Sequence, residues 1–424
     1  MKNNNHIILI SFDAFSIDNW EKACTLPNIK WLLENGSYTN KLNSVYPTLT
    51  YVVHTTMVTG VYPNRHNIYH NSPFQPFVKE NNQEWFWYKE ALTQQTIYEV
   101  AKEKGLKTAS IMWPVTGGAK FNYNLPEVRA INGENQAFKI LKNGTPFYII
   151  DMELKFGKDR ESYTQPHLDN FSTNCTCEVI KSKKPNLTMV HLIALDDAKH
   201  KYGTKSEKID EALRLVDNNI GKIIESTKEN GLIDNTTFIV VGDHGQFDVH
   251  KKIRLNKLLE EKGLISVKNQ SYRAYIQGNG GSAYLYIKEG DFEAEKIAID
   301  LLREATIMDI YGIETVYSTY DLEYLNVYKG AAYMIEAKKG YSFLEDLDGE
   351  IIVDLDKENK VYATHGYSPL KDDYTCNLIF SGKNIKKGVN LQGAEMVDIA
   401  PTIAKLLDVD FPYSDGRVLY EILK

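Results

Sequence analysis

The segment FIVVGDHG, residues 238–245, indicates the fold class of this chain. It is a short apolar run, rich in β-branched residues, that ends abruptly in an aspartate and a histidine. Two other segments have the same form and also end in aspartate: IILISFD at 7–13 and MVHLIALD at 189–196. Short apolar runs bounded by turn residues are typical of strands buried in a parallel sheet. The pattern predicts a sheet that delivers acidic residues to one edge.

Helical patterns alternate with these strands. Residues 96–104 and 206–228 repeat apolar side chains at helical spacing, and each pattern is closed by a glycine. A further apolar run at 108–112 reads as another strand, and residues 374–380 and 398–407 read as a late strand and a final helix. This alternation predicts an α/β fold in which helices cover a mostly parallel sheet.

Residues 266–360 do not follow this alternation. Two aromatic-rich runs at 272–276 and 283–287 flank the sequence QGNGGS, which predicts a β-hairpin. We therefore expect a small α+β cap subdomain inserted into a catalytic core made of residues 1–265 and 361–424.

The composition is that of a folded globular protein with an acidic balance. The 424 residues include 49 Lys+Arg and 56 Asp+Glu, for a formal net charge of -7, and 43% are hydrophobic. The acidic balance disfavours a nucleic acid polymer or an anionic membrane as a partner. Four cysteines cannot form a disulfide framework, and neither a secretory signal nor a run of about 20 apolar residues is evident. We expect a cytoplasmic protein.

Three aspartates are expected at one edge of the sheet. In open α/β sheets, ligands bind outside the carboxyl ends of the strands, where Asp13, Asp196 and Asp243 should lie. The alternative for each residue is that its carboxylate caps the following helix or turn. Three such residues on three strands favour a binding site.

Histidines accompany these aspartates. His200 follows Asp196 by four residues, a spacing that brings both side chains to one ion on a helical turn. His244 adjoins Asp243, and His365 lies in the sequence ATHGY. Any one histidine could simply be a hydrogen-bonded structural residue. Together with Asp13, however, the set offers six N/O ligands, which suits two zinc ions with open positions for substrate.

The charge of such a centre fits a phosphodiester. Two Zn²⁺ ions contribute +4 and three aspartates -3, which leaves about +1 against the single negative charge of a diester. The segment YPTLTY, residues 46–51, offers a nucleophile near a predicted helix start. Thr48 and Thr50 are both candidates on chemical grounds, because a helix N-terminus and a metal ion can each activate a hydroxyl. The alternative is that each threonine is only an N-cap.

These residues resemble the nucleotide pyrophosphatase/phosphodiesterase family of the alkaline phosphatase superfamily. The shared motifs, in chain order, are a strand-end Asp at 13, Pro-Thr-x-Thr at 47–50, Val-Thr-Gly-x-Tyr-Pro at 58–63, Asp-x-x-x-His at 196–200, Asp-His-Gly at 243–245 and His-Gly at 365–366. The resemblance implies a three-layer α/β/α sandwich. It also implies attack by a metal-bound Thr50, a phosphothreonine intermediate, and Asn71 as a hydrogen-bond donor to the phosphoryl group.

The same resemblance divides the ligands between two zinc ions. One ion is assigned to Asp13, Asp243 and His244. The other is assigned to Asp196, His200 and His365. The chain departs from the family pattern at Gln246, where a methionine usually follows Asp-His-Gly, and after the nucleophile, where Tyr51-Val52-Val53 replaces Phe-Pro-Asn.

Aromatic residues near the site suggest how a substrate is held. Trp85, Trp87, Trp113 and Tyr123 could sandwich a nucleobase or sugar, and Tyr51 could stack a base, although each could equally pack beneath a loop. We expect a small phosphodiester or nucleotide as substrate. The alternatives are a phosphomonoesterase, a metal-stabilised binding module without activity, and a phosphonoacetate hydrolase. The last would use Lys120 or Lys199 for the substrate carboxylate.

Overall fold

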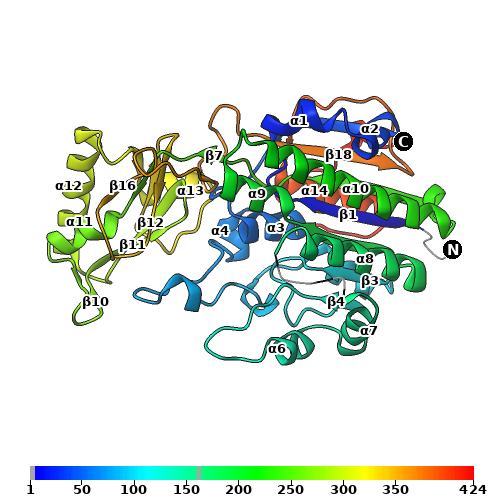
Figure 1. The fold of residues 1–424 in the computed structure, drawn as a ribbon, viewed down its shortest axis with the longest axis horizontal. Coiled ribbons are helices and arrows are strands. Elements are labelled where there is room, and N and C mark those ends of the chain that lie inside the picture. Colours follow the sequence, from blue (N-terminus) through cyan, green and yellow to red (C-terminus); the bar gives the residue numbers. More distant parts are fainter. Residues whose placement is uncertain (1–4, 159, 161–163) are drawn as a thin grey trace.

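An eight-stranded sheet forms the centre of the protein in the computed structural model, which describes residues 5–158, 160 and 164–424 (Figure 1). Strand β1 is hydrogen-bonded in parallel to β5 on one side and to β6 on the other, and only β18 runs antiparallel to its neighbours. The order across the sheet is β19 (Ala394–Glu395), β2 (Gly36–Asn43), β18 (Cys376–Gly382), β6 (Thr236–Val241), β1 (His6–Phe12), β5 (Leu187–Leu192), β3 (Thr108–Ile111) and β4 (Tyr123–Leu125).

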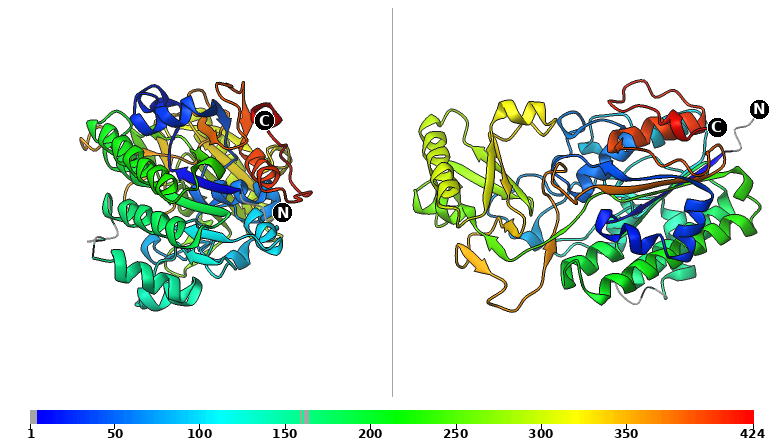
Figure 2. Two further views of the ribbon diagram at one scale, coloured as in Figure 1. Left: turned by 90° about the vertical axis from the view of Figure 1, so that its right-hand side faces the viewer. Right: turned by 90° about the horizontal axis from the view of Figure 1, so that it is seen from above.

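Side chains that alternate along β1 build two hydrophobic layers. Ile7 and Leu9 pack into one layer, and Ile8 and Ile10 pack into the other. The first layer is completed by α3 (Thr50–Thr59), α5 (Ile97–Glu103) and α14 (Ile399–Leu407), and the second by α2 (Pro27–Glu34), α7 (Pro146–Phe156), α8 (His167–Lys183) and α10 (Glu207–Glu229). Seen from above in Figure 2, α14 lies on one side of the sheet and α8 and α10 on the other. The three-layer α/β/α prediction is confirmed.

A second lobe carries its own sheets and core. The predicted hairpin is present, with β11 (Ala274–Gly278) paired antiparallel to β12 (Ser282–Ile287). The remaining helices and strands of the lobe are β8 (Lys251–Ile253), α11 (Leu255–Glu261), β9 (Ile265–Ser266), β10 (Ser271–Tyr272), α12 (Phe292–Met308), β13 (Ile313–Tyr317), α13 (Thr319–Tyr324), β14 (Tyr333–Ala337), β15 (Tyr341–Phe343) and β16 (Ile352–Asp354). Figure 1 shows this lobe beside the main sheet.

The packing shows that the second lobe begins earlier in the chain than the predicted boundary at residue 266. Ile253, Leu255 and Leu259 are buried in the hydrophobic cluster of the second lobe. The strand β8 also pairs with β15 and β16 within this lobe. The chain therefore leaves the core soon after the Asp-His-Gly segment.

Asp196 does not lie at a strand end, as the sequence pattern predicted. Strand β5 stops at Leu192, and α9 (Ala194–Tyr202) places Asp196 in its first turn. The buried carboxylate of Asp169 accepts hydrogen bonds from the backbone N–H groups of Ile193 and Ala194, each at 3.0 Å. This side-chain cap starts the helix before the apolar run has ended. Among the described residues, none of the helices has the length and hydrophobicity needed to cross a bilayer.

Candidate active site

Two neighbouring strands bring the first group of ligand-type side chains together. Asp13 directly follows β1, Asp243 and His244 follow β6, and their candidate ligand atoms lie within 4.8 Å of one another. The His244 Nε2 atom is 3.3 Å from Asp13 Oδ1 and 3.3 Å from Asp243 Oδ2. We call Asp13, Asp243 and His244 the inner group, because all three side chains are buried.

Gly242 allows this close approach at the end of β6. A Cβ atom at this position would lie 1.8 Å from the carbonyl oxygen of Phe15. Because glycine has no side chain, the backbone leading to Asp243 can pass close to the loop that follows β1. Any larger residue at position 242 would clash there. Asp243 Oδ1 then accepts hydrogen bonds from the N–H groups of Ala14 and His244, each at 3.0 Å.

The inner group holds unpartnered oxygens that a cation would satisfy. His191 Nε2 lies 2.9 Å from Asp13 Oδ2, so one oxygen of Asp13 is held, as one oxygen of Asp243 is. The other two oxygens, Asp13 Oδ1 and Asp243 Oδ2, are buried without a hydrogen-bond partner among the described residues. Buried polar atoms are nearly always partnered in native proteins. Two unpartnered carboxylate oxygens that converge on one imidazole therefore fit a metal ion.

The protonation preferences of the inner group indicate the same requirement. Burial raises the pKa of Asp13 to about 6, and the charge of Asp196 adds to this effect. Burial likewise raises the pKa of Asp243 well above its usual range, with repulsion from Asp13 as the next cause. Burial lowers the pKa of His244 well below its usual value, which keeps the imidazole in its neutral, metal-ligating form. A divalent cation would stabilise both carboxylates in their ionised state.

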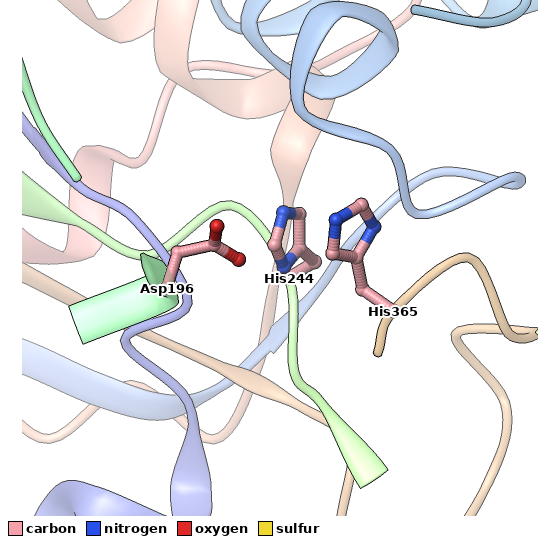
Figure 3. A group of neighbouring side chains, drawn as sticks. All are labelled: Asp196, His244 and His365. Carbon is pink, nitrogen blue, oxygen red and sulfur yellow. The ribbon is translucent and has the colours of Figure 1, made fainter. Parts of the chain in front are cut away.

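A second group lies next to the first and shares His244 with it. The ligand atoms of Asp196, His244 and His365 also lie within 4.8 Å of one another. We call Asp196 and His365, together with the adjacent His200, the outer group. Figure 3 shows the carboxylate of Asp196 directed toward the rings of His244 and His365. The two rings are stacked, with their centroids 3.9 Å apart.

Backbone carbonyls orient the other two histidines. His365 follows β17 (Ala363–Thr364), and its Nδ1 donates to the carbonyl oxygen of Thr48 at 3.1 Å. His200 Nδ1 donates to the carbonyl oxygen of Ala363 at 2.7 Å. Both rings therefore keep Nε2 free as a ligand. His200 lies outside the set of atoms within 4.8 Å, but its Nε2 is 3.4 Å from Asp196 Oδ1, so its assignment to the second ion stays a prediction.

The geometry distinguishes the two candidate threonines. Thr50 is the first residue of α3, and its Oγ1 lies 3.3 Å from His244 Nε2. Thr48 is fully buried, and its Oγ1 donates to the carbonyl oxygen of Tyr367 at 2.8 Å and accepts the N–H of Gly366 at 3.1 Å. Thr50 is therefore the hydroxyl beside the inner group, and Thr48 holds the loop that carries His365.

Asn71 is hydrogen-bonded to the first turn of α3. Its Oδ1 accepts the backbone N–H of Tyr51 at 3.0 Å, so the amide lies next to Thr50. This bond fixes the amide orientation, which leaves Nδ2 as a donor. Asn71 also lines a cavity of about 520 Å³ between the core and the second lobe.

That cavity adjoins the outer group. His200 and His365 contribute to its wall from the core, and Tyr275 and Phe343 contribute from the second lobe. Its charged lining comprises one lysine and four acidic residues: Lys79, Glu80, Glu345, Asp346 and Asp348. Asp346 is paired with Arg254.

Three of the aromatic residues predicted to stack a substrate, Tyr51, Trp87 and Tyr123, do not line this cavity. Tyr51 and Trp87 are only 1% and 2% exposed, and the ring of Trp87 is covered by Lys139 Nζ at 4.3 Å. Tyr123 packs against Tyr148, with ring centroids 5.7 Å apart. A stacking platform needs an open ring face. Trp85, another of the predicted residues, does line the cavity, and a stacking role for any of these residues stays a prediction.

Two residues that contact the aspartates were not assigned a role from the sequence. His191 is a histidine within the apolar run of β5, and an isolated polar residue in a buried strand was the available signal. Gln246 was noted only as a departure from the family pattern. Its Nε2 donates to Asp196 Oδ1, a residue 50 positions away in the chain, so sequence proximity gave no indication of the contact.

Comparison with known proteins identifies the family. Residues 7–368 match the sequence model described as type I phosphodiesterase/nucleotide pyrophosphatase. The chain belongs to this family. Similar family members include a venom phosphodiesterase of Naja atra, 27% identical over 249 residues, or 56% of this chain and 26% of that protein. Ectonucleotide pyrophosphatase/phosphodiesterase family member 1 of Homo sapiens is 28% identical over 272 residues, or 61% of this chain and 26% of that protein. The alignments thus span about a quarter of these relatives.

Solved structures of the family share the fold over the whole chain. Murine ectonucleotide pyrophosphatase/phosphodiesterase 5 covers 99% of this chain and 100% of its own, with a TM-score of 0.73 and 19% identity. An inactive variant of the same murine protein, in complex with AMP, has a TM-score of 0.71. Several relatives are venom proteins by name, so these comparisons lend no support to the cytoplasmic location expected from the sequence.

Proposed function

We propose that this chain is a phosphodiesterase/nucleotide pyrophosphatase that uses two zinc ions and forms a phosphothreonine intermediate on Thr50. The observation that carries the proposal is the position of Thr50. Its Oγ1 lies 3.3 Å from His244 Nε2, and His244 lies 3.3 Å from each of the two unpartnered oxygens of Asp13 and Asp243. Family membership supports the same reaction class.

The residues of this chain have distinct tasks in the proposed reaction. Thr50 Oγ1 attacks phosphorus, and the alcohol or phosphate opposite it departs. The Asn71 amide donates to a phosphoryl oxygen, and the positive end of the α3 dipole adds to this attraction, because helix N-termini favour anions. Water then hydrolyses the phosphothreonine. Divalent cations held by the inner and outer groups would lower the pKa of the hydroxyl and neutralise charge on the reacting oxygens.

The charges around the cavity favour a diester over a dianionic substrate. One lysine stands among four acidic residues in the lining. Arg65, the arginine nearest to the nucleophile in sequence, is ion-paired with Asp415. A phosphomonoester dianion would find little compensating charge in this arrangement.

The alternative of a phosphonoacetate hydrolase is weakened, because Lys199 is not available to bind a substrate carboxylate. Lys199 is fully buried, and its Nζ donates to the carbonyl oxygen of Ala14 at 2.9 Å and lies 3.0 Å from Asp18. Lys120, the other candidate, is exposed and does not line the cavity. The positions of these two lysines favour a phosphodiester over phosphonoacetate as the substrate.

A nucleotide is the substrate class that we propose. A murine family member has been solved with AMP, and in this chain Trp85 and Asn71 line one continuous cavity with His200 and His365. An aromatic ring and an amide beside the proposed metal centre suit a base and a phosphate of one small molecule. We do not expect a nucleic acid polymer as substrate.

Substitution of the two threonines tests the nucleophile. In zinc-loaded protein, Thr50→Ala should lower kcat for bis(p-nitrophenyl) phosphate by about 10³-fold or more, because the covalent route is lost. Thr48→Ala is the matched control and should instead reduce the free energy of unfolding by about 1–3 kcal/mol, because it leaves buried groups unpaired. Unchanged turnover in Thr50→Ala would overturn the assignment.

A substrate comparison tests the reaction class. We expect faster hydrolysis of an aryl phosphodiester, or of a nucleotide aryl ester, than of the matching aryl monoester. Phosphate release from phosphonoacetate should be negligible beside either reaction. A monoester that reacts faster than its diester would contradict the diester proposal.

A further inference from the structure

Gln246 contacts one of the carboxylates of the outer group. It follows the Asp-His-Gly segment, is 4% exposed, and its Nε2 donates to Asp196 Oδ1. The same nitrogen is 3.4 Å from the backbone oxygen of Asp196. The amide thus reaches from the loop after β6 to the first turn of α9.

This contact completes a pattern that all three site aspartates share. Asp13 is held at Oδ2 by His191, and Asp243 is held at Oδ1 by the N–H groups of Ala14 and His244. Asp196 is held at Oδ1 by Gln246. Each carboxylate therefore has one oxygen fixed by a protein group.

Asp196 depends more on its partner than the other two aspartates do. Its side chain is 17% exposed, against 3% for Asp13 and 0% for Asp243. Solvent can therefore compete for it, and surrounding atoms restrain its rotation less. His200 Nε2 lies 3.4 Å from the same Oδ1, so the oxygen that Gln246 holds also lies beside another candidate ligand of the outer group. Without the amide, the Asp196 carboxylate could turn away from His200.

The buried amide of Gln246 reduces the stability of the folded state. Gln246 Oε1 is buried and has no hydrogen-bond partner among the described residues. An unpaired buried carbonyl destabilises the folded state, and an apolar side chain of similar length would avoid this effect. The contact with Asp196 is therefore better explained by a task at the site than by stability.

We propose that Gln246 is a positioning residue that holds the Asp196 carboxylate in the orientation in which it faces the outer group and a cation bound there. The inference rests on the proposed function, because it presupposes that the outer group binds an ion. Groups that orient metal-binding carboxylates from behind commonly change metal affinity by about 10–100-fold when they are removed.

Zinc retention at graded chelator concentrations tests this role in the 424-residue chain. We expect wild-type protein to hold two equivalents of zinc, and Gln246→Met to release one of them at about tenfold lower chelator strength while the other is unchanged. Gln277→Met is the matched control, because Gln277 is a buried glutamine of the second lobe that hydrogen-bonds to the Ser72 backbone and not to a site aspartate. It should leave both equivalents unaffected.

A spectroscopic measurement separates positioning from a general loss of structure. With Co²⁺ in place of zinc, the visible absorption of the more weakly bound ion should change in Gln246→Met, and that of the tightly bound ion should not. Gln246→Asn is a second variant, since its amide is one methylene too short to reach Asp196. Circular dichroism and thermal melts establish that each variant is folded.

The outcomes distinguish the inference from the proposed function. Selective loss of one equivalent in both Gln246 variants supports the positioning role. Wild-type retention of both ions in either folded variant, or an equal loss of both ions, overturns it while two-ion binding stands. A wild-type protein that binds fewer than two ions overturns the two-ion centre itself, and the positioning role with it.

Discussion

The inner and outer groups lie side by side, yet they are built in different ways. Asp13 and Asp243 follow strands that are adjacent in the sheet, and their side chains are 3% and 0% exposed. Asp196 and His200 lie on α9, and their side chains are 17% and 27% exposed. His365 arrives from the segment that returns from the second lobe. The inner group is thus a product of the central sheet, whereas the outer group is assembled from a helix and a returning loop.

This difference suggests a division of labour. Thr50, the proposed nucleophile, contacts His244 of the inner group, while the outer histidines line the cavity proposed to receive the rest of the substrate. Rigid, buried ligands suit activation of a fixed hydroxyl. More exposed ligands suit a leaving oxygen and an incoming water, both of which must exchange with solvent.

The largest expected effect comes from removing one ligand of each group in turn. Asp243→Asn should lower kcat/KM by on the order of 10³-fold for every diester, because Thr50 is no longer activated. Asp196→Asn should slow esters of poorly acidic alcohols more than nitrophenyl esters, because it removes support for the leaving oxygen. Plots of log kcat/KM against leaving-group pKa measure this. Parallel plots for the two variants would contradict the division of labour.

A smaller effect is expected from replacing His191, which contacts Asp13 of the inner group. His191→Asn removes the contact at 2.9 Å to Asp13 Oδ2 and should weaken zinc binding by the inner group by about 10–100-fold. Zinc binding by the outer group should stay as in wild type, which is the opposite of the result expected for Gln246→Met. Zinc content after chelation at graded concentrations measures both. A His191 variant with the same zinc retention as Gln246→Met would contradict the comparison.

The smallest expected effect is a loss of zinc affinity at acidic pH. In the metal-free protein burial raises the pKa of Asp13 to about 6, so below that pH a proton competes with the inner ion for this carboxylate. Zinc affinity of the inner group should therefore fall by roughly tenfold between pH 6 and pH 5. Burial lowers the pKa of His365 to about 4, so this outer ligand stays neutral and available over the same range. Zinc titrations at pH 7.5, 6 and 5 test the difference.

The same raised pKa predicts the stability of the metal-free protein. The folded state holds the Asp13 proton more tightly than the unfolded state does, so this group contributes stability below its ordinary pKa that is lost as pH rises to about 6. Zinc should reverse the trend, since the ion binds the ionised form. Chemical unfolding with and without zinc at pH 5 and pH 7.5 provides the measurement.

Much of the fold followed from local pattern. The run at 7–12 corresponds to β1, the helix predicted over 206–228 is α10, and the hairpin around QGNGGS is present. The departures have local physical causes. Asp169 caps α9 early and moves Asp196 from a strand end to a helix, and Trp87 is covered by Lys139 rather than open to the cavity.

Sequence alone determined the chemistry that is available at the site. Residue types and spacing gave the aspartates, the histidines and two threonines, together with the strand ends that bring Asp13 and Asp243 to one edge, and the family resemblance added Asn71 and the preference for Thr50. Only the tertiary structure shows the distance from each threonine to the metal-type groups, which aromatic ring borders the cavity, and which protein group holds each carboxylate. These choices depend on burial and on contacts between residues as far apart as Thr48 and His365, or Gln246 and Asp196. Local sequence fixes what a side chain can do, but packing of distant segments fixes where its atoms lie.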